Sequence, residues 1–234
     1  MPRSIDTPPR TTEHRTGPTR VPFVRPDVPD FDALRPHFDA IMASGQLTKG
    51  PYLRRFEEAV ASHLGVRHAV AVSSCTVGLT LVWKALVLLS GRCLDPGCAV
   101  GRSRPLEAGG EVLLPSFTFL AAPGAVVWNG LRPRFVDVDR DSTNVVPAAV
   151  AEAITPRAVA LAACHNFGNP CDVPALSAVA AEHGLPLVVD AAHGFGGAVH
   201  GRPVGGGATA QVFSLSPTKL VVRSEEHTSE LPVT

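Results

Sequence analysis

Every third or fourth position is apolar between residues 31 and 44, and the same spacing returns between residues 51 and 64. In the first stretch the pattern opens with Phe31 and Leu34. This spacing places the apolar side chains on one face of a helix. The pattern therefore predicts two amphipathic helices, and Gly65 marks the end of the second.

From residue 68 onward, short apolar runs alternate with segments of helical spacing. The runs are continuous and rich in Val, Ala and Leu, which is typical of parallel strands buried on both faces of a sheet. Strands are predicted at 68–73, 111–115, 133–138, 158–163, 187–190 and 210–215, and helices at 76–89, 119–128, 147–154 and 173–183. This alternation predicts an α/β fold with a mostly parallel sheet flanked by helices.

Three segments do not follow this alternation. Residues 1–21 are rich in Pro, Thr and Arg and are predicted to be a disordered leader. Residues 90–110 are rich in Gly, Arg, Cys and Pro and are predicted to be a surface insertion. Residues 223–234 are polar without an apolar period, so no element is predicted there. The predicted large domain therefore covers residues 22–222.

Composition narrows the class of protein. Of the 234 residues, 45% are hydrophobic and 18% are charged, as in globular chains. Equal numbers of basic and acidic residues, 21 of each, argue against a general nucleic-acid binder. The most apolar window, residues 79–89, is too short for a membrane span and contains Lys84. Without an apolar signal segment, we expect a cytoplasmic protein with no membrane or nucleic-acid partner.

The chain has five cysteines. Cys93 and Cys98 form one loose pair, and Cys164 and Cys171 form another. Neither pair has the short gap that is typical of zinc sites. We therefore expect reduced thiols and no metal.

Three small residues, Ser74, Cys75 and Thr76, lie between a predicted strand and a predicted helix. Backbone N–H groups at a helix start attract anions, and the two hydroxyl groups add further donors. The segment is a candidate phosphate site. The alternative is an ordinary helix cap, because Ser and Thr commonly cap helices.

Asp190 ends an apolar strand, at the edge of the sheet where α/β folds bind ligands. His193 follows three residues later. The alternative for Asp190 is a helix cap, and the alternative for His193 is a hydrogen-bonded structural histidine.

Lys219 follows the last predicted strand, and the only other lysines are Lys49 and Lys84. A desolvated lysine can form a Schiff base with an aldehyde. The alternative is an exposed surface lysine. A phosphate site, a carboxylate at a strand end and a lysine after a strand are together what a pyridoxal phosphate enzyme requires.

Eight segments, in order, resemble the DegT/DnrJ/EryC1/StrS family of sugar aminotransferases. They are residues 45–51 with 56–57, 71–76, 114–119, 135–139, 154–157, 165–170, 189–193 and 213–219. The resemblance covers about residues 22–222. It implies the large domain of a fold-type I pyridoxal phosphate enzyme, similar to aspartate aminotransferase.

The resemblance also implies roles for particular residues. Lys219 matches the Schiff-base lysine and Asp190 the carboxylate at the pyridine nitrogen. Phe119 matches the aromatic residue on the cofactor ring, and His193 lies near the phenolic oxygen, where many members have Gln. The positions that match the phosphate ligands are Ser74, Cys75, Thr76 and Ser214.

By resemblance, the reaction moves an amino group from glutamate to a nucleotide-linked keto-deoxysugar, for antibiotics or surface polysaccharides, in a protein that is a homodimer when full length. Sugar dehydration, transamination of a cyclitol, and a non-catalytic cofactor-binding or regulatory role are the alternatives. Lys219 argues against the dehydratase branch of the family, which has His at this position.

The chain departs from the family pattern after Lys219. Family members continue through the rest of the large domain and a small C-terminal domain, which we expect to be absent here. Residues 223–234 resemble a translated sequencing adapter, and the alternative is a natural polar tail. We therefore expect a non-native tail on an N-terminal fragment that is itself inactive.

Overall fold

The computed structural model describes residues 29–90, 105–216, 218–219 and 229–233. The helices are α1 (Phe31–Ser44), α2 (Pro51–Leu64), α3 (Cys75–Leu89), α4 (Ala121–Trp128), α5 (Pro147–Ala153) and α6 (Val173–Glu182), with a short 3₁₀ turn, η2, at Asn166–Gly168. The strands are β1 (His68–Val72), β2 (Glu111–Pro115), β3 (Arg132–Val136), β4 (Ala158–Cys164), β5 (Leu187–Ala191), β6 (Ala198–Val199), β7 (Arg202–Pro203), β8 (Ala210–Ser214) and β9 (Ser229–Val233).

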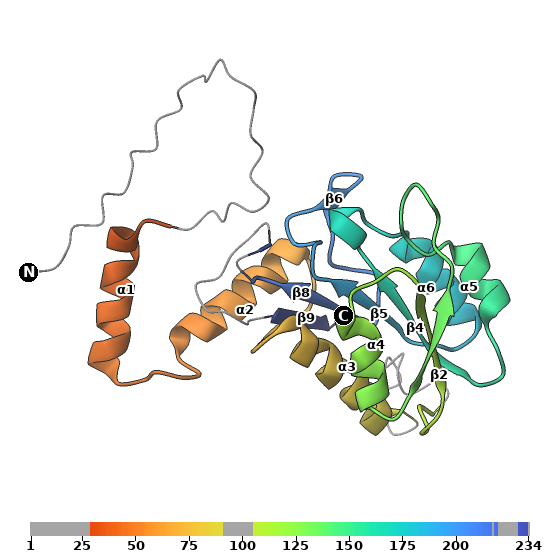
Figure 1. Ribbon diagram of the computed structural model, residues 1–234. Coiled ribbons are helices and arrows are strands. Elements are labelled where there is room, and N and C mark those ends of the chain that lie inside the picture. Colours follow the sequence, from red (N-terminus) through yellow and green to blue (C-terminus); the bar gives the residue numbers. More distant parts are fainter. Residues whose placement is uncertain (1–28, 91–104, 217, 220–228, 234) are drawn as a thin grey trace, which may run out of the picture.

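The main sheet has seven strands in the order β1-β9-β8-β5-β4-β2-β3, with helices on both faces (Figure 1). Strands β3, β2, β4, β5 and β8 pair in parallel, and β9 is antiparallel to both of its neighbours. The predicted α/β fold with a mostly parallel sheet is confirmed. The strand order places β5 and β8 side by side near the middle of the sheet.

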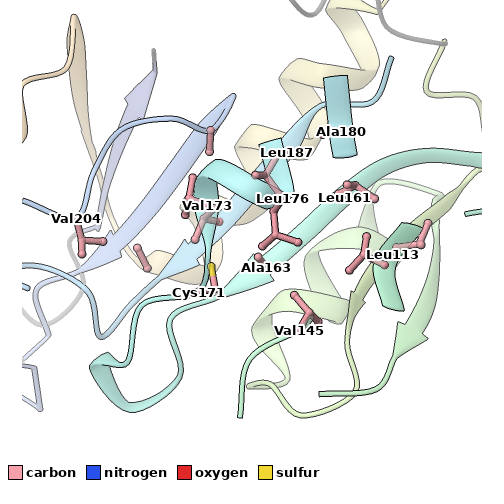
Figure 2. Packing of buried hydrophobic residues seen from close by; sticks show 14 of the residues in the cluster. Leu113, Val145, Leu161, Ala163, Cys171, Val173, Leu176, Ala180, Leu187 and Val204 are labelled. Atoms are coloured by element: carbon pink, nitrogen blue, oxygen red, sulfur yellow. The ribbon is translucent and has the colours of Figure 1, made fainter. Parts of the chain in front are cut away.

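Alternate residues of each strand contribute to one of two cores. Leu187 and Val189 of β5 face a core that contains residues of α2, α5 and α6. Val188, between them, faces a second core with residues of α3 and α4. Figure 2 shows the first core, in which Leu176 of α6 and Leu161 of β4 are labelled. Because both faces are covered, the central strands are mostly apolar, as their sequences indicate.

Local signals in the sequence explain where the helices begin and end. Pro51 occupies the first turn of α2, where its missing N–H is not needed. Gly65 ends that helix in the left-handed region, with φ 66°. Ser74 caps α3, and its hydroxyl oxygen accepts a hydrogen bond from the N–H of Val77 at 3.2 Å.

The expectation that every strand is buried on both faces is wrong for the two edge strands, β1 and β3. In β1, His68 and Val70 are exposed, and β3 departs further. Arg132, Arg134 and Phe135 are exposed, and only Val136 is buried. The reason is its position, because β3 is an edge strand that pairs only with β2. Charged side chains on an edge strand also discourage pairing with a further chain.

The expectation that the polar tail forms no element is wrong for residues 229–233. They form β9, which pairs with β1 on one side and β8 on the other. Strand pairing uses backbone N–H and C=O groups, which nearly any sequence supplies, and β1 and β8 each present such groups toward the same gap. Pro232, opposite Ala69, lacks an N–H and weakens the ladder there. That this tail is non-native stays a prediction.

The segments outside the alternation differ in their outcomes. The predicted leader, 1–21, lies outside the described residues. In the predicted insertion, 90–110, Leu106 is only 3% exposed and packs in the second core, while its neighbours Pro105 and Glu107 are exposed. This segment is therefore anchored to the core at Leu106. Helix α1 has no buried residue and lies away from the sheet (Figure 1). Among the described helices, none is long and apolar enough to cross a membrane.

Candidate active site

The predicted site residues lie on segments that meet at the carboxyl ends of β5 and β8. Asp190 is in β5, Ser214 ends β8, and Cys75 begins α3. The thiol of Cys75 is 3.9 Å from Oδ1 of Asp190 and 3.9 Å from the carbonyl oxygen of Val212. The structure therefore brings the start of α3 against these two strands, a convergence that the spacing of the residues did not establish.

Lys219 and His193 are in direct contact. Nζ of Lys219 is 2.8 Å from Nε2 of His193, and the N–H of Lys219 donates to the carbonyl oxygen of Ser216. Partial burial and the positive charge of Lys219 both lower the pKa of His193. A neutral imidazole with a lone pair on Nε2 accepts a hydrogen bond from the ammonium group. His193 is therefore a hydrogen-bonded histidine, as one of the two interpretations held, and its partner is Lys219.

Asp190 is a buried carboxylate, 5% exposed. Its Oδ1 accepts hydrogen bonds from the N–H of Ala192 at 3.0 Å and from the thiol of Cys75. Burial raises its pKa, while the Ala192 N–H and the charge of Lys219 act in the opposite direction. A cationic N–H donor bound next to Asp190 would offset the remaining cost of burying the carboxylate.

The start of α3 has the features of an anion site. The Ser74 hydroxyl is used as a helix cap, as the alternative interpretation holds. In the described part of the chain, the backbone N–H groups of Cys75 and Thr76 have no hydrogen-bond partner, and the side chain of Thr76 is exposed. The Cys75 thiol is directed to Asp190, so this residue offers an anion only its backbone.

Two predicted residues are placed differently. Ser214 is 7% exposed, and its hydroxyl accepts a long 3.4 Å hydrogen bond from the N–H of Ser216. Phe119 lies just before α4 and is 74% exposed. Within the described residues, no ring or polar contact joins its side chain to the other predicted site residues. An exposed ring at this edge is free to contact a ligand.

Sequence reasoning used residues 165–170 as a family motif and gave no role to the residues in it. In the structure, the ring of Phe167 stacks on that of His193, with centroids 6.3 Å apart and planes at 10°. Phe167 also has a positive φ of 53°. Asn and Gly are common in tight turns, so the neighbouring Asn166 and Gly168 were the sequence signal that could have indicated a turn at Phe167.

His165 gives the fold a dependence on pH. Its side chain is fully buried, Nδ1 accepts a hydrogen bond from the N–H of Cys171, and burial lowers its pKa to about 4. In the unfolded chain, an ordinary histidine titrates near pH 6.5. The stabilisation by the neutral ring is complete above about pH 6.5 and is lost progressively as the pH falls toward about 4.

We expect this linkage to remove about 2.5 kcal/mol of stability between pH 7.5 and 4.5. Urea unfolding at both pH values measures it. In His165→Asn the difference in unfolding free energy between the two pH values should shrink by about that amount. His68→Asn, at an exposed position of β1, is the matched control and should retain the dependence. An equal difference in His165→Asn and the unaltered chain would contradict the assignment.

The donors at the site fit one kind of ligand. Lys219 offers an amine, Asp190 a buried acceptor for a cationic ring N–H, and the start of α3 free N–H groups for a phosphate. An aldehyde-bearing, phosphorylated pyridine carries the three complementary groups. The residues present therefore fit pyridoxal phosphate.

The chain belongs to the DegT/DnrJ/EryC1/StrS aminotransferase family, whose pattern matches residues 32–226. It is 34% identical over 184 residues to the spore coat polysaccharide biosynthesis protein SpsC of Bacillus subtilis (strain 168). That match covers 79% of this chain and 43% of SpsC.

Solved structures give the same result. DesI, determined in the presence of its TDP-sugar product, is 41% identical with a TM-score of 0.73, over 89% of this chain and 48% of DesI. The aminotransferase TlmJ from Streptoalloteichus hindustanus is 32% identical with a TM-score of 0.75, over 92% of this chain and 53% of TlmJ. The chain thus spans about half the length of these relatives.

Proposed function

We propose that this chain forms the cofactor-binding part of a pyridoxal phosphate aminotransferase that acts on a nucleotide-linked keto-deoxysugar, with glutamate as the amino donor. The observation that carries the proposal is the convergence of Lys219, Asp190 and the start of α3 at one edge of the sheet. Membership of the family supports the reaction, and the TDP-sugar product named for DesI supports the class of substrate.

Each residue has a proposed role. Lys219 binds the aldehyde carbon through Nζ and carries the proton that moves during amino transfer. Asp190 accepts a hydrogen bond from the protonated pyridine nitrogen and keeps it charged. Bound pyridoxal phosphate supplies an electron sink for the reacting carbon. The phosphate group is held by Ser74, the backbone of Cys75, Thr76 and Ser214.

Two further side chains complete the site. The Phe119 ring stacks on the cofactor, for which its exposure leaves it free. His193 donates a hydrogen bond toward the phenolic oxygen. A dehydratase role is less well supported, because Lys219 stands where that branch of the family has His.

The proposed assembly is a cytoplasmic homodimer. Exposed apolar side chains at the two ends of α4 support self-association, since Leu120 is 78% exposed and Trp128 is 84% exposed. Light scattering on the purified protein measures the assembly. A particle of one chain that nonetheless carries out both halves of the reaction would contradict the dimer.

The two halves of the proposed reaction can be tested separately. The full-length protein, loaded with pyridoxal phosphate, should convert glutamate to 2-oxoglutarate with loss of the near-visible absorption of the cofactor. Addition of a TDP-4-keto-6-deoxysugar should then yield an amino sugar nucleotide, detected by mass spectrometry. A dehydrated sugar without nitrogen would instead indicate the dehydratase alternative, and binding without either half-reaction would indicate a non-catalytic role.

A further inference from the structure

Phe167 has an unusual backbone for a bulky residue. It lies in η2 with φ 53° and ψ 23°, in the left-handed region that aromatic residues rarely adopt. Its side chain is nonetheless 75% exposed, so burial of the ring does not compensate for the strain. Strain of this kind persists only where surrounding contacts hold it, and it is common at functional sites.

The contacts that hold this turn come from its neighbours. The side-chain amide of Asn166, itself 6% exposed, donates to the carbonyl oxygen of Phe117 at 3.0 Å and to that of Thr143 at 2.7 Å. The carbonyl oxygen of Asn169 accepts a hydrogen bond from the side chain of Asn144. Both sides of Phe167 are therefore fixed to other loops, which determines where its ring lies.

The fixed ring lies against the imidazole of His193. The two planes are nearly parallel, at 10°, and the Phe117 ring packs on Phe167 with centroids 6.0 Å apart. His193 in turn contacts the lysine, with its Nε2 2.8 Å from Nζ of Lys219. One continuous row of contacts thus leads from Phe117 through Phe167 and His193 to the lysine.

We propose that Phe167 is a positioning residue: its ring holds the His193 imidazole in the orientation that directs Nε2 toward the amine of Lys219. The contacts exist in the chain without cofactor. Only the use of this orientation in amino transfer rests on the proposed function. An ammonium group that donates to Nε2 requires the tautomer with its proton on Nδ1. Phe167 therefore helps to select the tautomer of His193 as well as its orientation.

The electrostatic surroundings of His193 are defined. Lys219 acts on it directly and, with partial burial, lowers its pKa. The titratable groups on the adjoining elements include Asp190 on β5, Cys75 on α3, Cys164 on β4 and His165, whose ring lies beneath Gly194. None of these groups is altered by a change at Phe167, so a change in the titration of His193 reports on the stacked ring.

The test uses ¹⁵N–¹H spectra of the histidine side chains in the cofactor-free chain across a pH titration, with the His193 signals assigned from His193→Gln. In the unaltered chain we expect the Nδ1–H tautomer. Phe167→Gly suits the left-handed backbone but removes the ring that covers the imidazole, so it should raise the pKa of His193 and mix the tautomers. Phe167→Tyr retains a flat ring and should behave as the unaltered chain.

The outcomes separate a positioning role from a structural one. Circular dichroism checks folding, and Phe167→Asn, which also tolerates a positive φ, replaces the glycine variant if that variant does not fold. If the folded variant that lacks the ring shows an unchanged tautomer and titration of His193, the proposal is overturned. It is also overturned if Phe167→Tyr shows the same changes as the variant that lacks the ring. Because no cofactor is present, failure of the proposed aminotransferase activity leaves this result unaffected.

Discussion

In the full-length protein, Lys219→Ala is expected to abolish the near-visible absorption of bound pyridoxal phosphate and all turnover. The physical reason is that Nζ of Lys219 is the proposed bond to the aldehyde and the proposed carrier of the proton. No other amine is held at the carboxyl ends of β5 and β8 among the described residues. Absorption spectra of the loaded protein, and borohydride reduction followed by peptide mapping, measure the result.

The other two lysines provide matched controls. Lys84 is exposed on α3, and Lys49 lies just before α2. Lys49→Ala and Lys84→Ala should retain the absorption and the turnover. If mapping places the pyridoxyl group on Lys49 or Lys84, the assignment of Lys219 is wrong.

In the full-length protein, Asp190→Ala is expected to reduce turnover by orders of magnitude while the cofactor still binds. Breaking a buried charge pair costs about 3–5 kcal/mol, which corresponds to about a 10²–10⁴-fold loss if the whole cost falls on the transition state. The proposed partner is the protonated pyridine nitrogen, which loses its counter-charge in the variant. Steady-state kinetics and the absorption of the loaded protein separate turnover from binding.

The control is the stability of the protein without cofactor. Burial raises the pKa of Asp190, so its charged form costs the apo protein free energy. Asp190→Asn should therefore unfold at no lower urea concentration than the unaltered chain, although it too lacks the charge that the proposed reaction requires. Near-normal turnover in Asp190→Ala would contradict the role of the carboxylate, and a large loss of apo stability in Asp190→Asn would show that it is structural.

The order of the elements followed from the sequence. Helical spacing predicted α1 and α2, including the end of α2 at Gly65. Continuous apolar runs predicted β2, β4, β5 and β8, because strands covered on both faces need apolar residues at every position. Two-residue strands such as β6 and β7 are too short to leave a period, so the sequence did not predict them.

The sequence by itself determined the chemistry of the site, because residue types and their places at strand and helix ends are local features. It named Lys219, Asp190 and the start of α3, and the resemblance joined them into one family. Only the tertiary structure decided what depends on pairing between distant segments. The contact of Cys75 with Asp190, the stacking of Phe167 on His193 and the insertion of β9 between β1 and β8 are of this kind. Local sequence carries no signal for such contacts, since strand order and loop packing are set by which surfaces the whole chain must bury.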